Sequence, residues 1–360
     1  MPDLRPPTLK DVAQQAGVHV GTASRALSED QSHLVSEATR LRVHSAAGVL
    51  GYRTNAVAQS LRKGTTGVLG VVVADLSNPF TVTLLRGIEF ESRAGRHMPL
   101  IAETHDDPQI LRSVVTRLLR NRVDGIVLTA AQVDDEEFVR ELEGLVPVVL
   151  AVRGFLASTR PGSPGEHVEV LQDDVAGART AVEHLIGIGH RRIAQLSGTP
   201  SISSFVGRRE GFAAAIRAHA DVVDVSTGGY ARESSVEEGR RLMGDLLRQP
   251  AERRPTAIFA HNDLMAVGAL NALRSAGLRC PEDVSVVGYN DAPLIDQIDP
   301  PLTTVRLPGF ELGRHSARIA FGLLRGATPQ ESRVMLAPQF IERRSTQPPP
   351  PSVPSLQDSL

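Results

Sequence analysis

The chain has 360 residues, which is too long for one ordinary hydrophobic core and predicts two or three compact units. The formal net charge of -2 hides an asymmetry, because residues 1–65 carry eight Lys and Arg against five Asp and Glu, whereas the remainder carries 31 against 36. A mildly basic first unit joined to a mildly acidic body fits a head that contacts nucleic acid and a body that does not.

Cysteine content and apolar runs restrict the compartment. Cys280 is the only cysteine, which excludes an intrachain disulfide and fits a reducing compartment. No apolar run approaches the ~20 residues of a membrane span, and residues 1–7 lack the apolar core of a signal peptide. The sequence therefore predicts a cytoplasmic protein without membrane contact, and it argues against a secreted binding protein.

Residues 8–27, TLKDVAQQAGVHVGTASRAL, predict a helix, a tight turn and a second helix. Thr8 can cap the first helix with Asp11 as its acidic partner, and Gly17 supplies the turn. The outward face of the second helix carries no carboxylate and consists of His19, Val20, Gly21, Thr22, Ser24 and Arg25. Such a face suits a DNA major groove. An ordinary helical hairpin is the alternative.

Two further helices follow. Ser36 begins a third helix that ends at Gly51, and residues 54–62 predict a short helix that would be marginal alone in water. The short helix must therefore be stabilised by a partner.

From Gly67 onward, short apolar runs alternate with segments of helix length, which predicts an α/β body of two doubly wound parallel sheets. A Gly, Pro and Ser-rich loop at 154–166 separates two similar halves, and the chain returns to the first half after Val305 and crosses again near Leu336. The Pro-rich residues 346–360 predict a disordered tail that lacks the heptads of a tetramerising coiled coil.

The chain resembles the LacI/GalR family of bacterial transcription regulators. The resemblance rests on motifs that run in the family's order from residue 8 to about 345: TLKDVAQQAGV, TASRAL, VSEATRLRV, LGYRTNAVAQSLR, DLSNPF, VDGIVL, GHRRIAQLSG, FAHNDLMAVGAL, DVSVVGYND and PPLTTVR. It implies a homodimeric repressor that binds a palindromic operator in double-stranded DNA and responds to a small-molecule effector.

The resemblance also implies a domain plan. A helix-turn-helix head would span 1–53, a hinge helix and linker 54–65, and a periplasmic-binding-protein-like body 66–345. Within the body, 66–160 with 306–335 would form one subdomain, and 161–305 with 336–345 the other.

By the same resemblance, Thr8 contacts DNA, and the hinge contributes Asn55, Ala58 and Leu61, with Leu61 as a minor-groove wedge. Thr54 stands where the family usually has Pro, which removes a rigid helix start. A plain linker helix with Leu61 packed inward is the alternative.

Loops that follow parallel strands line the ligand cleft in such sheets. The expected effector residues are Asp75, Asn78, Phe80, Val152, Ser204, Arg208, Asn262 and Asn290. Helix capping is the alternative role for Asn78, Asn262, Asp263 and Asp291.

Many sugar-sensing members carry Asp at the positions of Val152 and Asn290. This sequence has lost both charges and keeps Arg208, which the family uses to clamp the effector. With Asp263 and Asp291 acting as caps, Arg208 would be the least compensated charge in the cleft, so we expect an anionic effector such as an acidic sugar derivative. A constitutive DNA-binding scaffold without effector response is the alternative.

No dinucleotide-binding, Walker, zinc-ligand or nucleophile-elbow motif occurs, so the sequence predicts neither an enzyme nor a cofactor or metal. A small-molecule sensor that does not bind DNA is a further alternative, but it leaves residues 8–62 unexplained.

Overall fold

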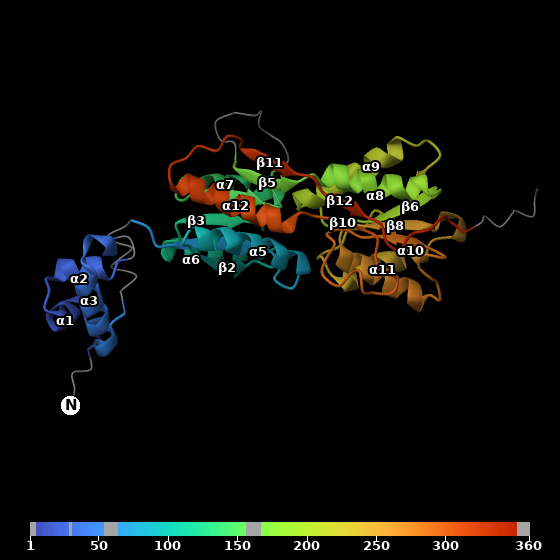
Figure 1. The fold of residues 1–360 in the computed structure, drawn as a ribbon. Coiled ribbons are helices and arrows are strands. Elements are labelled where there is room, and N and C mark those ends of the chain that lie inside the picture. Colours follow the sequence, from blue (N-terminus) through green and yellow to red (C-terminus); the bar gives the residue numbers. More distant parts are fainter. Residues whose placement is uncertain (1–4, 29–30, 54–63, 156–166, 351–360) are drawn as a thin grey trace, which may run out of the picture. The chain divides into compact units, whose positions relative to one another are not determined.

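The computed structural model describes residues 5–28, 31–53, 64–155 and 167–350. The chain divides into two compact units, Met1–Thr66 and Gly67–Leu360, which are drawn in Figure 1. None of the helices within the described ranges is both long enough and apolar enough to cross a membrane.

The first unit is a small helical head. It contains α1 (Leu9–Ala16), α2 (Val20–Ala26), the 3-10 turn η1 (Ser32–Leu34) and α3 (Glu37–Leu50). Its buried core consists of six alanines and two valines, whose small side chains let the helices approach closely. The predicted boundaries are confirmed: Thr8 and Asp11 form a capping box, Gly17 has a φ of 65°, Ser36 caps α3 and Gly51 ends it.

The second unit, the body, begins with a lobe built on six parallel strands in the order β11-β5-β4-β3-β1-β2. These strands are β1 (Val68–Val73), β2 (Met98–Glu103), β3 (Gly125–Leu128), β4 (Val148–Ala151), β5 (Glu169–Gln172) and β11 (Arg333–Leu336). The helices are α5 (Pro79–Ala94), α6 (Pro108–Arg120), α7 (Glu136–Glu143) and α12 (Gly309–Leu324), and η2 (Val133–Asp135) precedes α7.

Alternation along the strands fills both faces of this sheet. Val127 points toward α5 and α12, whereas Ile126 and Leu128 point toward α6 and α7. This sheet and its four helices form the first lobe.

The second lobe is built on four parallel strands in the order β7-β6-β8-β9. These strands are β6 (Arg192–Leu196), β7 (Val223–Asp224), β8 (Ala257–Ala260) and β9 (Ser285–Val287). Helices α8 (Asp174–Gly187) and α9 (Ser203–Arg217) pack on one face, and α10 (Val236–Leu247) and α11 (Asp263–Ser275) pack on the other. The 3-10 turn η3 (Ala251–Arg253) follows α10.

The crossovers between the lobes differ from the expected plan at one place. The second subdomain was expected to begin at residue 161, but β5 pairs with β4 and β11 in the first lobe, so this boundary is wrong and the chain crosses only after Gln172. An apolar run predicts a buried strand but does not reveal which sheet contains it. The later crossovers lie beside an antiparallel pair, β10 (Thr304–Arg306) and β12 (Gln339–Ile341).

The first five residues of the predicted tail belong to the described structure. Disorder was expected from residue 346, yet residues 346–350 are described and partly bonded to the second lobe, so the expectation is wrong for this stretch; 351–360 lie outside the described residues. Gln347 donates its backbone N–H to Ser285 Oγ at 3.1 Å, and its carbonyl accepts from His190 Nε2 at 2.9 Å. Composition alone does not reveal such specific backbone contacts.

The burial of His190 predicts that the stability of the fold depends on pH. The side chain is fully buried, and burial lowers the pKa of His190 to about 4 from 6.5. Between these values the unfolded chain binds a proton that the folded chain does not, so we expect the free energy of unfolding to fall, by on the order of 3 kcal/mol, as the pH drops through this window. Urea denaturation across the window should show a weaker pH dependence for His190→Asn. Equal pH dependence in the two proteins would contradict this assignment.

Candidate DNA-binding face and effector cavity

Helix α2 presents the face that the sequence assigned to DNA. His19 is its N-cap, with Nδ1 accepting from the Gly21 N–H at 3.1 Å, and the first turn of the helix carries no acidic residue. Arg25 Nε donates to the Gly21 carbonyl at 3.2 Å, while Val20 is 37% exposed. A Cβ at residue 21 would lie 3.4 Å from His19 Nδ1, so glycine leaves the space between His19 and Arg25 open.

Three of the other DNA candidates, Thr8, Thr22 and Ser24, lie in the described part of the head. The Thr8 hydroxyl lies 2.7 Å from the Asp11 carboxylate in the capping box, while Thr22 and Ser24 are half-buried on α2. Asn55, Ala58 and Leu61 lie outside the described residues.

The body contains a cavity of about 380 Å³ at the carboxyl ends of the first-lobe strands. Most of its lining comes from the loops after β1, β2, β3 and β4, and one short segment comes from the second lobe. The lining residues are Ala74, Asp75, Ser77, Asn78, Phe80, Thr81, Leu84, Glu103, His105, Asp106, Thr129, Val152, Arg153, Glu233 and Ser234. The position is the one at which open parallel sheets bind ligands.

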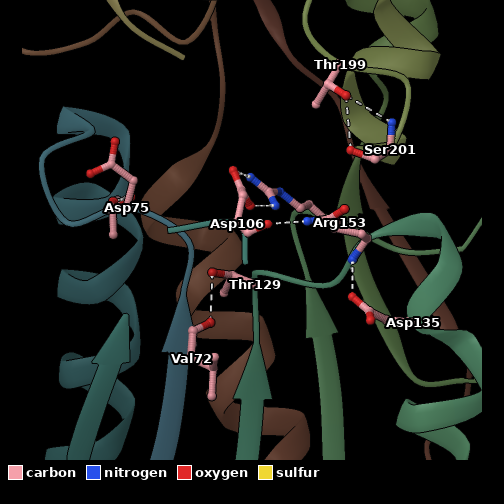
Figure 2. A network of polar contacts seen from close by, with 10 residues as sticks. Val72, Asp75, Asp106, Thr129, Asp135, Arg153, Thr199 and Ser201 are labelled. Carbon is pink, nitrogen blue, oxygen red and sulfur yellow. Dashed lines mark hydrogen bonds and ion pairs between the residues drawn. The ribbon is translucent and has the colours of Figure 1, made fainter. Parts of the chain in front are cut away.

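Carboxylates dominate the polar side of this cavity. Arg153 forms a two-contact ion pair with Asp106, one contact of which joins Nη2 to Oδ2 at 3.3 Å (Figure 2). Asp75 Oδ1 accepts from the Ser77 N–H at 2.7 Å, and Glu103 Oε1 accepts from the Leu76 N–H at 2.7 Å. The one arginine of the lining is therefore already neutralised by protein.

Unusual backbone conformations occur at the rim. Val152, His105 and Asp106 have φ values of 68°, 53° and 56°. The left-handed region is unfavourable for a β-branched residue. Val152 is held there by two hydrogen bonds: its N–H donates to the Val170 carbonyl and its carbonyl accepts from Gln172 Nε2, both at 3.0 Å.

Arg208 does not line this cavity and belongs to a buried cluster of the second lobe. Its Nε donates to Asp174 Oδ1 at 2.9 Å, Nη1 donates to the His261 carbonyl, and the guanidinium carbon lies 3.9 Å from the centre of the Tyr289 ring. Arg208 itself is only 3% exposed. Desolvation raises the pKa of the Asp174 carboxyl, and the charge of Arg208 opposes that rise.

Comparison with known proteins decides the family. The model of bacterial regulatory proteins of the lacI family matches residues 8–55, and the model of a periplasmic binding protein-like domain matches 182–346. The HTH-type transcriptional regulator GalS of Salmonella typhimurium is 32% identical over 341 residues, which cover 94% of this chain and 96% of that protein. This chain belongs to the LacI family.

Further relatives support the assignment of this protein to the LacI family. The HTH-type transcriptional repressor CytR of Escherichia coli is 30% identical over 342 residues, covering 94% of this chain and 96% of that protein. The solved structure of the lac repressor dimer bound to operator and the anti-inducer ONPF has a TM-score of 0.82 at 27% identity, covering 95% of this chain and 100% of that one. A transcriptional regulator CelR-cellobiose complex has a TM-score of 0.68 at 31% identity, covering 94% and 99%.

These relatives are DNA-binding transcription regulators and not enzymes. The LacI-family chain is accordingly a sequence-specific DNA-binding transcription regulator, and its body has the periplasmic-binding-protein-like fold that the resemblance implied.

Four of the eight expected effector residues line the cavity of this LacI-family body: Asp75, Asn78, Phe80 and Val152. The other four, Ser204, Arg208, Asn262 and Asn290, are buried outside it. The expectation that Arg208 is the least compensated charge in the cleft is wrong, because Asp174 pairs with it. This ion pair could not be predicted from the sequence, because Asp174 lies 34 positions away on another helix.

The helix-cap alternative is partly confirmed. Asn78 Oδ1 accepts from the Phe80 N–H at 3.1 Å, and Asn262 Oδ1 accepts from the Met265 N–H at 2.7 Å, so both cap their helices. Asp263 instead accepts from Thr304 at 2.6 Å and from the Ala292 N–H at 2.7 Å, and burial raises its pKa to about 7. Asp291 forms ion pairs with two arginines of the later crossovers, Arg306 and Arg343.

Several residues that line the cavity were not predicted from the sequence. Arg153 follows Val152 directly, and Glu103 ends β2, so the rule that ligands lie beyond strand ends could have found them. Glu233 and Ser234 follow no strand end of the first lobe, and no sequence signal brings them to this cavity.

Proposed function

We propose that this regulator is a cytoplasmic repressor that binds a palindromic operator as a homodimer and responds to a small molecule in the body cavity. The observation that carries the proposal is the acid-free outer face of α2, with the cavity as a separate feature of the body. The effector changes DNA affinity by binding one arrangement of the two lobes better than the other.

Base readout is assigned mainly to Arg25. The family resemblance implies that Val20 and Gly21 stand at the two positions that read bases most, and a valine and a glycine offer few polar contacts. We expect Arg25→Ala to relax specificity at one guanine of each half-site, at a cost of ~1–3 kcal/mol. Selection from random duplexes with both proteins measures this. An unchanged site with uniformly weaker binding would mean that Arg25 contacts phosphate instead.

The homodimer is supported by apolar side chains at one side of the first lobe. Strand β2 is an edge strand, on which Met98, Leu100 and Ile101 are 71%, 40% and 42% exposed. Helix α5 adjoins β2 (Figure 1). On this helix, Val82 and Phe90 are 50% and 56% exposed. An uncovered edge strand with apolar side chains favours pairing with another chain.

This surface gives a second test. We expect Phe90→Asp to shift the full-length protein from dimer to monomer and to weaken operator binding at least tenfold, because both half-sites can no longer be held at once. Sedimentation equilibrium measures the mass, and Val223→Asp, a 54% exposed valine of the second lobe, is the matched control. A Phe90→Asp dimer as stable as the parent would place the interface elsewhere.

The hinge is proposed to contact DNA through one apolar side chain. Leu61 is proposed to insert into a base step of the minor groove when residues 54–62 fold on DNA.

Four of the expected effector residues are not proposed to hold the effector, because they do not line the cavity: Ser204, Arg208, Asn262 and Asn290. An anionic effector is not proposed either. The candidate effector site is the cavity, which Arg208 does not line and which is rich in carboxylates.

A further inference from the structure

The cavity holds an excess of negative charge. Its lining contains four carboxylates, Asp75, Glu103, Asp106 and Glu233, against one guanidinium, Arg153, and one imidazole, His105. Asp106 and Arg153 neutralise each other through their ion pair. An anion placed here would therefore meet three further carboxylates with no unpaired arginine in the lining.

Two of these carboxylates keep acceptor capacity for a ligand. One oxygen of Asp75 accepts from the Ser77 N–H, and within the described ranges the other oxygen contacts no donor. Glu233 forms no hydrogen bond or ion pair with any part of the chain that the structure describes. By contrast, both oxygens of Glu103 have a neighbour in the protein: Oε1 accepts from the Leu76 N–H, and Oε2 lies 3.6 Å from Nε2 of His105, which forms an ion pair when that imidazole is protonated.

The two available carboxylates come from different lobes. Asp75 follows β1 in the first lobe, and Glu233 precedes α10 in the second. Like charges on the walls of one cavity repel each other, and a cation between them removes the repulsion and attracts both. Such a ligand would bind best in the lobe arrangement that brings the two walls together.

The remaining walls indicate the size and polarity of the ligand. Phe80 and Leu84 supply an apolar side, whereas Ser77, Thr129 and Ser234 supply hydroxyls. Figure 2 shows the Thr129 hydroxyl in the same close-up as Asp75 and the Asp106–Arg153 pair. A volume of about 380 Å³ accommodates one small molecule with a few hydroxyl groups.

We propose that the effector is a small hydroxylated cation, whose protonated amine lies between Asp75 and Glu233. This inference rests on the proposed effector function of the cavity. It replaces an acidic ligand by a basic one, and an amino sugar is the simplest chemical class that combines the required charge, hydroxyls and size.

Matched sugars test the charge directly on the full-length protein. The probes are glucosamine and galactosamine, each compared by calorimetry with its neutral parent, its N-acetyl form and its uronate. We expect at least one amino sugar to bind ten or more times more tightly than its three partners, because charge-assisted hydrogen bonds form only with the amine. Asp75→Asn and Glu233→Gln should each reduce that advantage about tenfold, whereas Asp134→Asn, an exposed carboxylate outside the cavity, should not.

Three outcomes would overturn the inference: equal or tighter binding of a neutral sugar or uronate, an amino-sugar advantage that survives both substitutions, or no binding of either amino sugar. Operator release, measured in parallel, separates the two proposals. If a neutral sugar binds and releases DNA, the effector function stands and the cationic class falls. If an amino sugar binds through Asp75 and Glu233 without changing DNA affinity, the cationic site stands and the effector function falls.

Discussion

Replacing Arg208 by methionine is expected to lower the free energy of unfolding of the body by about 3–5 kcal/mol. The substitution removes the partner of Asp174 at a place where both side chains are almost fully buried, 4% and 7% exposed. It also removes the guanidinium that lies against the Tyr289 ring and donates to the His261 carbonyl. Breaking a buried ion pair leaves an uncompensated charge, and burial already raises the pKa of Asp174.

A double variant separates charge from packing. Arg208→Met combined with Asp174→Asn should recover part of the loss, because no unpaired charge remains. Chemical denaturation of the two single variants and the double variant measures the coupling. If Arg208→Met left stability unchanged and abolished only effector binding, Arg208 would be the ligand clamp that the family resemblance implied.

Gly239→Ala is expected to give the second large effect. Helices α10 and α11 approach so closely that a Cβ at Gly239 would lie 2.2 Å from the Met265 carbonyl oxygen. The contact is reciprocal, since a Cβ at Gly268 would lie 2.1 Å from the Val236 carbonyl oxygen. Backbone atoms cannot move aside as a flexible side chain can, so the helices must separate, at a cost of about 1–3 kcal/mol or more.

Gly244→Ala is the matched control on the same helix. The nearest atom to a Cβ there is Arg248 Nη1 at 3.7 Å, an ordinary contact with the end of a flexible side chain. Alanine should raise stability at this position by roughly 0.5–1 kcal/mol, because glycine is unfavourable within a helix. Thermal unfolding should therefore move the two melting temperatures in opposite directions. Equal shifts would show that helix propensity, and not the close approach, controls both positions.

Local sequence signals predicted the head well. Thr8, Gly17, Ser36 and Gly51 act on residues within a few positions of themselves, so their capping and turn roles could be identified without knowledge of the fold. His19 is the exception, because it was assigned to the outward face and also caps α2 through Nδ1.

Long-range pairing limited what could be predicted in the body. The apolar runs predicted buried strands from residue 67 onward but not their partners: β5 pairs with β4 and with β11, the latter more than 150 positions away. The same limit applies to Arg208 and Asp174, and to Glu233, which joins a cavity formed mostly by another lobe. The net charge of a binding site depends on such long-range pairings. For this reason the sequence predicted an anionic ligand, whereas the carboxylates of the cavity disfavour one.

The central claim is that a dimer of this protein reads a two-fold symmetric DNA sequence through α2, and selection from random duplexes with the full-length protein tests it most directly. The account predicts enrichment of a palindrome with two equivalent half-sites, and loss of a guanine preference in both half-sites with Arg25→Ala. Enrichment of an asymmetric single site, or retention of random duplexes without any enriched sequence, would contradict it.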